Sequence, residues 1–373
     1  MAANAAREVR ERCLRQVKAR VVSGDLLMSL HREDVPLEQA LAFAARHNAR
    51  RGFLFVSRLL GRHIPTRPTA LRQSAAALAD KLVATLPRQP CIFIGMAETA
   101  TTLGQAVFRE FRRRGGVGLY LDTTRRRTGG PLAFSFAEEH SHSPEQLVHV
   151  PTTSEDPEAW FGRASTLVIV DDELTTGRTM AALAAAYRTY AGQPVEVHVA
   201  TLVSWQGPCA AGGGFEVHSL VEGEFTFAHN AAFVPETNSS AIATVHVAPP
   251  FGTRHGVRDA QVPAWPDEAP GRVLVVGAGE FGFIPFVVAE QIERDGGVAF
   301  VQATTRSPVA LGDAVQHVRR FPALSGEGYV EFLYNVPDDH SYDRVIVCVE
   351  DRLPPEGHPM RTIPRVEWRS ARG

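Results

Sequence analysis

The sequence predicts an α/β protein: a parallel-sheet core with a helical N-terminal region, followed by a second, smaller α/β domain. Three observations lead to this prediction. The chain has 373 residues, more than one ordinary core accommodates. Short apolar runs alternate with helix-like segments, as they do in parallel sheets covered by helices. The order of these segments in the middle of the chain returns near its C-terminus.

The N-terminal region is charged and contains many helix formers. We therefore expect residues 1–40 to form a helical segment ahead of the first domain. The Ala-rich run at 70–86 predicts another helix, which Pro87 and Pro90 close. An aromatic stretch at 50–65, RRGFLFVSRLLGRHIP, interrupts this helical region.

The first domain is predicted to span residues 41–250. Its apolar runs are short and rich in β-branched residues, which favours buried strands separated by helices. Strands are expected at 91–95, 117–122, 166–172 and 195–205, and helices at 99–113 and 178–190.

A segment rich in proline and glycine follows, with weak periodicity, and we interpret residues 251–270 as a linker. The second domain then covers residues 271–373. Alternation of strands and helices resumes there. Strands are expected at 272–277, 298–302 and 343–351, and a helix at 284–294.

The second domain repeats landmarks of the first. Glu98 precedes a Thr-Thr-Arg triplet at Thr123 by 25 residues, and Glu280 precedes the same triplet at Thr304 by 24. A third landmark follows at matched spacing, TLVIVDD in the first copy and RVIVCVED in the second. The copies then diverge, because prolines in RLPPEGH forbid the loop that ELTTGRT forms. The sequence predicts a degenerate repeat, with one ligand loop kept and one lost.

Composition narrows the class of protein. A net charge of −2 argues against general nucleic-acid binding, so anionic ligands must be held by local clusters. No stretch approaches the ~20 apolar residues of a membrane span. The four cysteines form no CxxC pair, and the N-terminus lacks the apolar core of a signal peptide. We expect a cytoplasmic protein that binds small molecules rather than nucleic acid or membrane.

The stretch LVIVDDELTTGRT at 167–179 carries the strongest chemical signal. Asp171 and Asp172 end a buried strand, where open α/β sheets bind ligands. The Thr-rich loop enters a helix whose first N–H groups favour a phosphate, and Gly177 allows close backbone approach. A phosphate beside two acids suggests a phosphorylated sugar. Its vicinal hydroxyls would donate hydrogen bonds to the two carboxylates. The alternative is a capped helix after a strand-end acid pair, with no ligand.

These residues resemble the phosphoribosyl-pyrophosphate signature of type I phosphoribosyltransferases. The resemblance implies that the acids bind the ribose hydroxyls and, probably through water, Mg²⁺, and that the loop binds the 5-phosphate. It assigns this part of the site to Asp171, Asp172, Glu173, Thr175, Thr176, Gly177, Arg178 and Thr179.

A wider resemblance covers most of the chain. The runs FLFVSRLLGRHIP and FSFAEEHSHSP, and TTRSP at 304–308, resemble a bacterial group with a phosphoribosyltransferase followed by a TRSP domain. That group is associated with tellurite-resistance and stress gene neighbourhoods. The resemblance leaves the acceptor open.

Two segments are expected to hold the pyrophosphate. The turn GMAET at 95–99 follows a strand and opens a helix, and it suits the family's pyrophosphate loop through Met96, Ala97, Glu98 and Thr99. Arg125 and Arg126 follow the next strand and are candidates to meet pyrophosphate oxygens, Arg125 in a catalytic role. An ordinary turn and a solvated basic turn are the respective alternatives.

The segment 128–146 occupies the place of the family's mobile catalytic loop. His140 within it is a candidate catalytic residue that would exchange a proton with the base. Together with Glu138, Glu139 and His142 it also permits a metal-site interpretation, since HxH on an extended segment puts both imidazoles on one side. A structural role is a third possibility.

The base-binding surface is the part of the site that the sequence predicts least clearly. Phe53, Phe55, Arg62 and His63 offer aromatic faces and polar groups for a carbonyl-rich ring, and VEGEFTFAHN at 221–230 is another candidate. The two phenylalanines serve equally well as core.

Three functions follow from these residues. The leading one is a phosphoribosyltransferase that uses phosphoribosyl pyrophosphate, Mg²⁺ and a nucleobase-like acceptor, and a homodimer is the expected assembly. A non-catalytic regulatory protein that binds phosphoribosyl pyrophosphate or a nucleotide is the alternative. A metal-dependent hydrolase using residues 138–142 is the third. GAGEFG at 277–282 matches a dinucleotide motif, but the next strand offers Gln302 where that motif requires an acid.

Overall fold

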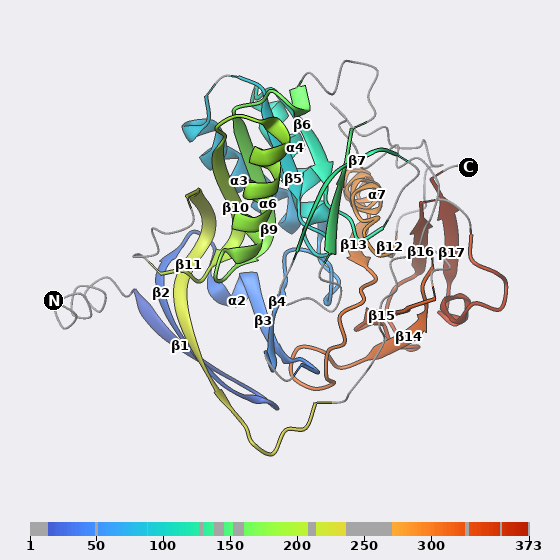
Figure 1. Ribbon diagram of the computed structural model, residues 1–373. Coiled ribbons are helices and arrows are strands. Elements are labelled where there is room, and N and C mark those ends of the chain that lie inside the picture. The colour runs from blue at the N-terminus through green and yellow to red at the C-terminus, as the bar shows by residue number, and fades with distance from the viewer. Residues whose placement is uncertain are drawn as a thin grey trace.

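The structure is a computed structural model. It describes residues 14–48, 51–87, 89–126, 130–137, 145–151, 160–207, 214–235, 271–324, 328–350 and 353–371. Two α/β bodies lie side by side, and the C-terminal one is coloured orange to red in Figure 1. The predicted linker 251–270 falls outside the described residues. In the part of the chain that is described, no helix combines the length and apolar character needed to cross a membrane.

A seven-stranded sheet, in the order β1-β2-β11-β10-β9-β5-β6, forms the first body. The strands from β11 to β6 are parallel to one another, while β1 and β2 add to the β11 edge in antiparallel fashion. The strands are β1 (Arg15–Val21), β2 (Gly24–Glu33), β5 (Cys91–Gly95), β6 (Gly118–Asp122), β9 (Thr166–Leu174), β10 (Glu196–Ser204) and β11 (Glu216–His229).

The expected N-terminal helix is wrong over residues 15–33, which form the β1–β2 hairpin. The reason is a period of two: Leu26, Met28 and Leu30 of β2 are buried, and the residues between them are exposed or half-buried. Lys18, Arg20 and Asp25 occupy exposed positions of the hairpin, so the segment is charged without being helical. Next come a short helix, α2 (Leu37–Ala40), and a second hairpin, β3 (Leu41–Ala45) and β4 (Phe53–Ser57).

Helices cover both faces of the parallel strands. On one face lie α3 (Pro68–Thr85) and α4 (Thr101–Arg113), and their apolar residues share a core with Val168 and Val170 of β9. On the other lies α6 (Arg178–Ala191), which packs on Leu167 and Ile169. Alternate strand residues face opposite layers, so a strand buried on both sides reads as the continuous apolar run LVIV. A hairpin of β7 (Leu132–Ala137) and β8 (Glu145–His149) joins the α6 layer.

The second body confirms the predicted repeat. Its parallel sheet has the order β13-β12-β16-β17, which matches β6-β5-β9-β10 strand for strand. A helix follows the first strand of each copy and a hairpin follows the second. The elements are β12 (Arg272–Gly277), α7 (Phe283–Arg294), β13 (Val298–Ala303), β14 (Val318–Pro322), β15 (Val330–Tyr334), β16 (Arg344–Val349), the 3₁₀ helix η1 (Pro359–Thr362) and β17 (Val366–Ser370).

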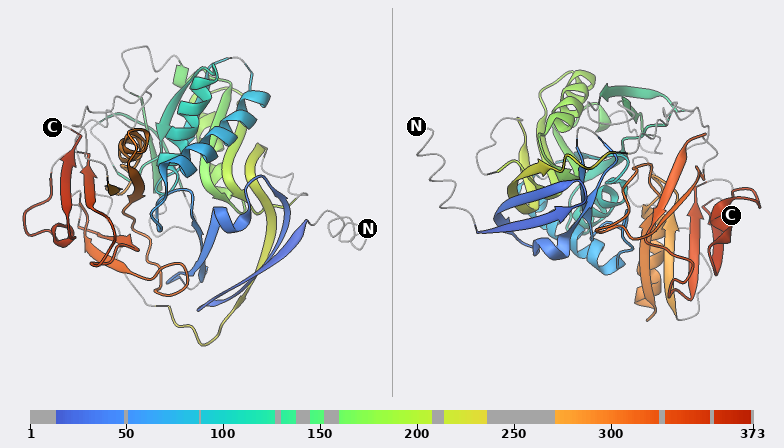
Figure 2. Two further views of the ribbon diagram at one scale, coloured as in Figure 1. Left: turned by 180° about the vertical axis from the view of Figure 1, so that it is seen from behind. Right: turned by 90° about the horizontal axis from the view of Figure 1, so that it is seen from below.

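The repeat extends to single hydrogen bonds. After β5, the Thr123 hydroxyl accepts the Ala97 N–H at 2.8 Å; after β12, the Thr304 hydroxyl accepts the Gly279 N–H at 2.7 Å. The two bodies meet through the helices of the repeat, α4 and α7, where Arg109 forms a two-pronged ion pair with Glu290 at 2.7 and 2.9 Å. Both views of Figure 2 show the second body on one side of the first, against this helical layer.

Candidate functional site

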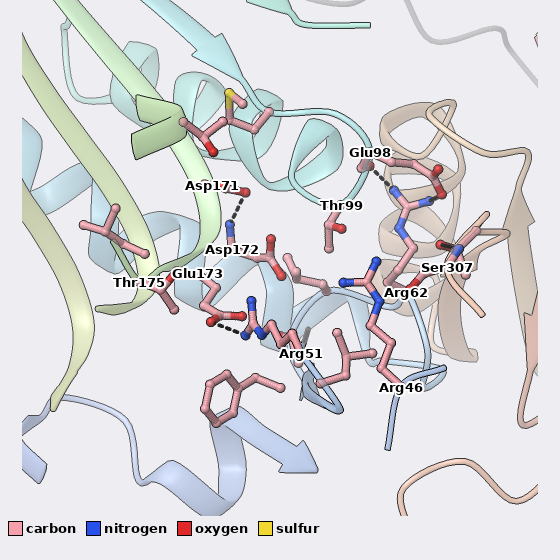
Figure 3. A pocket seen from close by; sticks show the side chains of 18 of the residues that line it. Arg46, Arg51, Arg62, Glu98, Thr99, Asp171, Asp172, Glu173, Thr175 and Ser307 are labelled. Atoms are coloured by element: carbon pink, nitrogen blue, oxygen red, sulfur yellow. Dashed lines mark hydrogen bonds and ion pairs between the residues drawn. The ribbon is translucent and has the colours of Figure 1, made fainter. Parts of the chain in front are cut away.

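A cavity of about 540 Å³ opens where β5 and β9 end. Its walls come from these strand ends, the start of α6, the β3–β4 hairpin and the segment 305–307 of the second body (Figure 3). Carboxyl ends of parallel strands meet at one edge of a sheet, so the polar residues that follow two different strands share this space.

Two acids end β9 inside the cavity. The Asp171 carboxylate accepts the backbone N–H of Asp172 at 2.9 Å, and both side chains line the cavity. Burial raises the pKa of the Asp172 carboxyl above its ordinary value, against the opposing effects of Asp171 and of Arg62 and Arg51. The ionised pair therefore gains free energy from a ligand that donates hydrogen bonds or carries positive charge.

Glu173 continues the acidic edge but already has a partner. Its carboxylate lies 2.6 Å from the Arg51 guanidinium, which reaches across from the loop before β4. Burial raises the pKa of Glu173, and Arg51 opposes this change. Glu173 therefore anchors Arg51 at the cavity wall (Figure 3).

The loop from Thr175 to Thr179 turns the chain from β9 into α6 along the cavity wall. Gly177 is the N-cap of α6 with φ +73°, a left-handed conformation that glycine adopts without strain. A Cβ at this position would lie 2.8 Å from both the Gln206 amide and the Phe215 ring, so only glycine fits here without a shift of its neighbours. The dipole of α6 and the N–H groups of its first turn favour an anion here.

The turn after β5 forms the opposite wall. Glu98 and Thr99 line the cavity, and the peptide before them is held by the Thr123 hydroxyl and by Gln146, which donates to the Ala97 carbonyl at 3.0 Å. Arg125, which follows β6, lines the same end of the cavity. Its N–H donates to Glu280 of the second body at 3.3 Å.

An aromatic group closes the cavity beside the β3–β4 hairpin. Phe53, Phe55 and Phe225 line it, yet Phe53 and Phe55 are only 5% and 4% exposed. Phe55 stacks on Trp205 with ring centroids 4.7 Å apart, and the Arg51 guanidinium lies 4.8 Å from the centroid of Phe53. These rings therefore offer mainly their edges to a ligand.

Two family models match the chain. Residues 40–219 match a family described as phosphoribosyl transferase, and residues 253–360 match the TRSP domain, described as lying C-terminal to that transferase domain. The chain belongs to the phosphoribosyl transferase family that carries a TRSP domain. The comparison with curated proteins found no match.

Solved phosphoribosyltransferases resemble parts of the chain. Adenine phosphoribosyltransferase from Rhodothermus marinus is 15% identical, with 50% of this chain and 96% of that chain covered, at a TM-score of 0.36. The Trypanosoma brucei enzyme, solved with AMP, pyrophosphate and ribose-5-phosphate, is also 15% identical; 50% of this chain and 77% of that chain are covered, at a TM-score of 0.35. A hypoxanthine-guanine phosphoribosyltransferase from Bacillus anthracis reaches 10%, with 39% and 72% covered and a TM-score of 0.26. TM-scores of this size carry no argument for this chain.

The structure brings most of the predicted site residues of the phosphoribosyl transferase domain to one cavity. Those assigned to the ribose and 5-phosphate all line it, as do the pyrophosphate candidates after β5, Arg125, and the base candidates Phe53, Phe55, Arg62 and His63. The catalytic candidate His140 and its neighbours Glu138, Glu139 and His142 lie outside the described residues.

Three of these residues need correction. Arg126 does not line the cavity: it is buried against the TRSP domain, where its guanidinium donates to the Tyr329 hydroxyl at 3.2 Å. Arg62 lines the cavity, but its guanidinium donates hydrogen bonds to the carbonyls of Glu98, Gly279 and Thr304. The His63 imidazole is buried against Tyr334, and burial lowers its pKa to about 3. Arg62 and His63 thus support the domain boundary more than they face a base.

Sequence reasoning missed one group of lining residues and left the role of a second group open. Arg46, Asn48 and Arg51 belong to the β3–β4 hairpin, whose turn brings basic residues over the acids of β9. Thr305, Arg306 and Ser307 belong to the TRSP domain. The TTRSP motif at 304–308 indicates this second group, either as a binder of a phosphate-bearing group or as a lid or dimer partner of the first site.

Mg²⁺ fits the acidic edge of this cavity. Asp171 and Asp172 supply the carboxylate oxygens that this hard cation prefers, and both are half-buried with room beside them. A cation would also offset the burial that raises the pKa of Asp172.

Proposed function

We propose that this protein is a phosphoribosyltransferase that uses phosphoribosyl pyrophosphate with Mg²⁺ and joins the ribose to a nucleobase-like acceptor. One observation carries the proposal: the acid pair of β9, the glycine-capped start of α6 and the Glu98–Thr99 turn line a single cavity of about 540 Å³. That volume lies within the range of roughly 300–1,000 Å³ typical of small-molecule sites.

The residues divide between the two ends of the sugar. Asp171 and Asp172 accept hydrogen bonds from the vicinal ribose hydroxyls. The 5-phosphate binds the N–H groups at the start of α6 and the hydroxyls of Thr175, Thr176 and Thr179. Holding the sugar at both ends fixes its C1 atom toward the turn after β5, and this positioning lowers the entropic part of the barrier.

The reaction exchanges one bond at C1 for another. The C1–O bond to pyrophosphate breaks with both electrons leaving on the pyrophosphate oxygen. A ring nitrogen of the acceptor forms the new bond with C1, and its proton passes to solvent. Mg²⁺, when bound, neutralises part of the charge on the pyrophosphate. Arg125 and the N–H groups of the Glu98–Thr99 turn stabilise the rest.

The acceptor would lie beside the β3–β4 hairpin. Phe53, Phe55 and Phe225 present ring edges there, and Arg46 and Asn48 offer polar groups at the same wall. Ring edges carry partial positive charge, and arginine donates hydrogen bonds but accepts none. This wall therefore favours an electron-rich, carbonyl-bearing ring over an amino-substituted one.

Incubation with phosphoribosyl pyrophosphate, Mg²⁺ and a panel of bases tests the proposal by the release of pyrophosphate. We expect release with carbonyl-bearing rings, reduced by roughly 100-fold or more in the double variant Asp171→Asn, Asp172→Asn. Turnover retained by that variant would remove the mechanism. Tight binding of phosphoribosyl pyrophosphate without turnover of any base would instead favour the regulatory alternative.

A further inference from the structure

We propose that the TRSP domain completes the pyrophosphate end of this site, with Arg306 and Ser307 binding the leaving pyrophosphate across the domain boundary. The proposal rests on the proposed function and assigns the TRSP motif a part in it. Thr305, Arg306 and Ser307 line the same cavity as Glu98, Thr99 and Arg125. Figure 3 shows Ser307 and Glu98 on the side of the cavity that faces the TRSP domain.

The Arg306 side chain is held in place before any ligand arrives. Its guanidinium lies 3.8 Å from the centroid of the Tyr329 ring, donates to the Tyr329 hydroxyl at 2.9 Å and lies 3.7 Å from the Glu98 carboxylate. Its side chain is 7% exposed. A fixed guanidinium loses little entropy when it binds an anion, and its planar fork matches two phosphate oxygens.

The contact between the two domains is reciprocal. The Glu98 carboxylate of the first copy accepts the N–H of Arg306 at 3.1 Å, and the Glu280 carboxylate of the second copy accepts the N–H of Arg125 at 3.3 Å. Glu98 and Glu280 are equivalent in the repeat, as are Arg125 and Arg306. Each copy thus holds the Thr-Thr-Arg turn of the other, which is the pattern of a two-fold interface.

This symmetry explains why a second α/β core is attached to the first. The TRSP domain occupies the position of a second subunit and presents its arginine turn to the first site. Its own sugar loop is lost, because RLPPEGH replaces ELTTGRT. One complete site per chain follows, with Arg125 and Arg306 supplied by the two copies.

The charge balance at this end needs Arg306. Pyrophosphate carries several negative charges, and Glu98 adds another at the same wall. Arg62 lies 3.5 Å from Glu98 but donates to three carbonyls, so it mainly neutralises that carboxylate. Arg125 and Arg306 line the same wall and add positive charge there, and Ser307 adds a hydroxyl donor.

Calorimetry with two probes tests the proposal: Mg²⁺-pyrophosphate for this end of the site, and ribose-5-phosphate for the other. Arg306→Gln should weaken pyrophosphate binding by roughly 10- to 100-fold, the usual loss for a charged hydrogen bond, and leave ribose-5-phosphate affinity unchanged. Arg306→Lys should have an affinity for pyrophosphate between those of the wild-type protein and Arg306→Gln. Lysine keeps the positive charge but lacks the planar guanidinium that meets two phosphate oxygens. Arg294→Gln, which removes an exposed charge on α7, is the matched control.

The outcomes separate the two proposals. Retained ribose-5-phosphate binding shows that a variant has folded. Wild-type affinity for pyrophosphate in Arg306→Gln would overturn the role of the TRSP domain and leave the proposed function intact. Binding of neither probe by the wild-type protein would overturn both.

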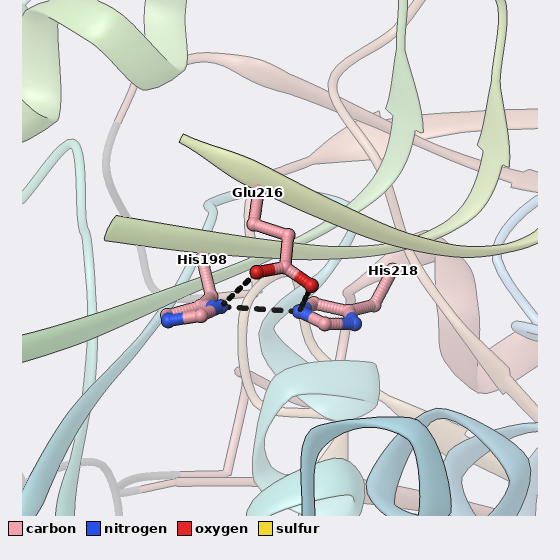
Figure 4. Close-up of side chains that lie close together, drawn as sticks. All are labelled: His198, Glu216 and His218. Atoms are coloured by element: carbon pink, nitrogen blue, oxygen red, sulfur yellow. Dashed lines mark hydrogen bonds and ion pairs between the residues drawn. The ribbon is translucent and has the colours of Figure 1, made fainter. Parts of the chain in front are cut away.

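A second cluster, far from this cavity in the sheet, points to a metal ion. We infer that His198, Glu216 and His218 form a zinc site at the start of β10 and β11 (Figure 4). His198 and Glu216 are register partners on adjacent strands, and His218 is two residues further along β11, so all three side chains emerge on one face. The cluster lies near the N-terminal ends of these parallel strands, whereas the acids of β9 lie near the C-terminal end of theirs.

The ligand atoms already converge. His198 Nδ1 and His218 Nε2 are 3.1 Å apart, and the Glu216 carboxylate lies 3.9 Å from the first and 3.8 Å from the second. Zinc–nitrogen bonds of ~2.0–2.1 Å in a tetrahedral site set the ligand nitrogens about 3.3 Å apart. His198 Nε2 is buried and lies 3.3 Å from Glu196, the usual placement of a carboxylate that orients a ligating imidazole. A hydrogen bond between the imidazoles is the competing explanation.

Dialysis of the wild-type protein against Zn²⁺ alone, followed by metal analysis and thermal unfolding, distinguishes the two. One equivalent of zinc and a raised melting temperature are expected, both lost in His218→Gln. The control is His229→Gln, an exposed histidine of the same strand. Zinc bound equally by wild type and His218→Gln, or by neither, would overturn the site.

Discussion

Asp172 shows how a single residue can serve binding at the expense of stability. It follows Asp171 and the four fully buried apolar residues of β9, and burial raises its pKa. The ionised carboxylate is therefore disfavoured in the folded protein. This penalty is absent below the unfolded pKa, grows as pH rises to the folded value and is complete above it. Sites that bind sugars or cations commonly contain such residues.

We predict that Asp172→Asn raises the melting temperature by a few degrees at pH 7–8 while abolishing transferase activity. The gain should shrink as pH falls through the raised pKa, because wild-type Asp172 then becomes neutral as well. Melting curves across pH 4–8 provide the measurement.

The control for this experiment has the opposite sign. Asp25 is exposed and paired with Arg20, which lowers its pKa. Asp25→Asn should lose a little stability at neutral pH and lose none in acid. An equal response of the two variants to pH would contradict the burial argument.

Among the elements, the start of α6 is the proposed 5-phosphate site. Gly177 adopts φ +73°, and a Cβ there would lie 2.8 Å from both the Gln206 amide and the Phe215 ring. Gly192 ends the same helix at φ +63° with no atom within 4 Å of its would-be Cβ. The two glycines share one backbone conformation and differ in their surroundings.

Gly177→Val should lower the affinity for ribose-5-phosphate at least tenfold and destabilise the fold by roughly 1–3 kcal/mol, the usual cost of such strain. Gly192→Val shares the backbone strain but adds no such clash, so it should lose less stability and keep its affinity. Calorimetry and urea unfolding of both variants separate strain from blocked binding. Equal affinity of the two variants for ribose-5-phosphate would contradict the assignment of the 5-phosphate to this loop.

At the scale of the molecule, the chain behaves as a two-fold pair made from one polypeptide. The sheet order β6-β5-β9-β10 returns as β13-β12-β16-β17, and the helices α4 and α7 of the two copies pack together. Gly282 allows their close approach, since a Cβ there would lie 2.0 Å from the Thr102 hydroxyl. The covalent link removes the concentration dependence of a true dimer and lets one copy specialise.

Local sequence is enough to bring together the residues that we propose for the ribose and the 5-phosphate. LVIVDDELTTGRT specifies a buried strand, two acids and an open helix start through local periodicity and one glycine, so its interpretation needed no distant residue. The repeat could also be predicted from the sequence, because it depends only on the spacing of its landmarks along the chain. The β1–β2 hairpin was missed because alternation in a charged segment is ambiguous between strand and helix.

Only the tertiary structure decided what completes the cavity. Arg51 reaches Glu173 across 122 residues, and Arg306 reaches Glu98 across 208. It also directed Arg126 to Tyr329 and Arg62 to backbone carbonyls. Such contacts depend on how separate elements pack, and a long, flexible arginine side chain can reach several partners. Local sequence fixes which groups are present, whereas packing between distant elements fixes which of them meet.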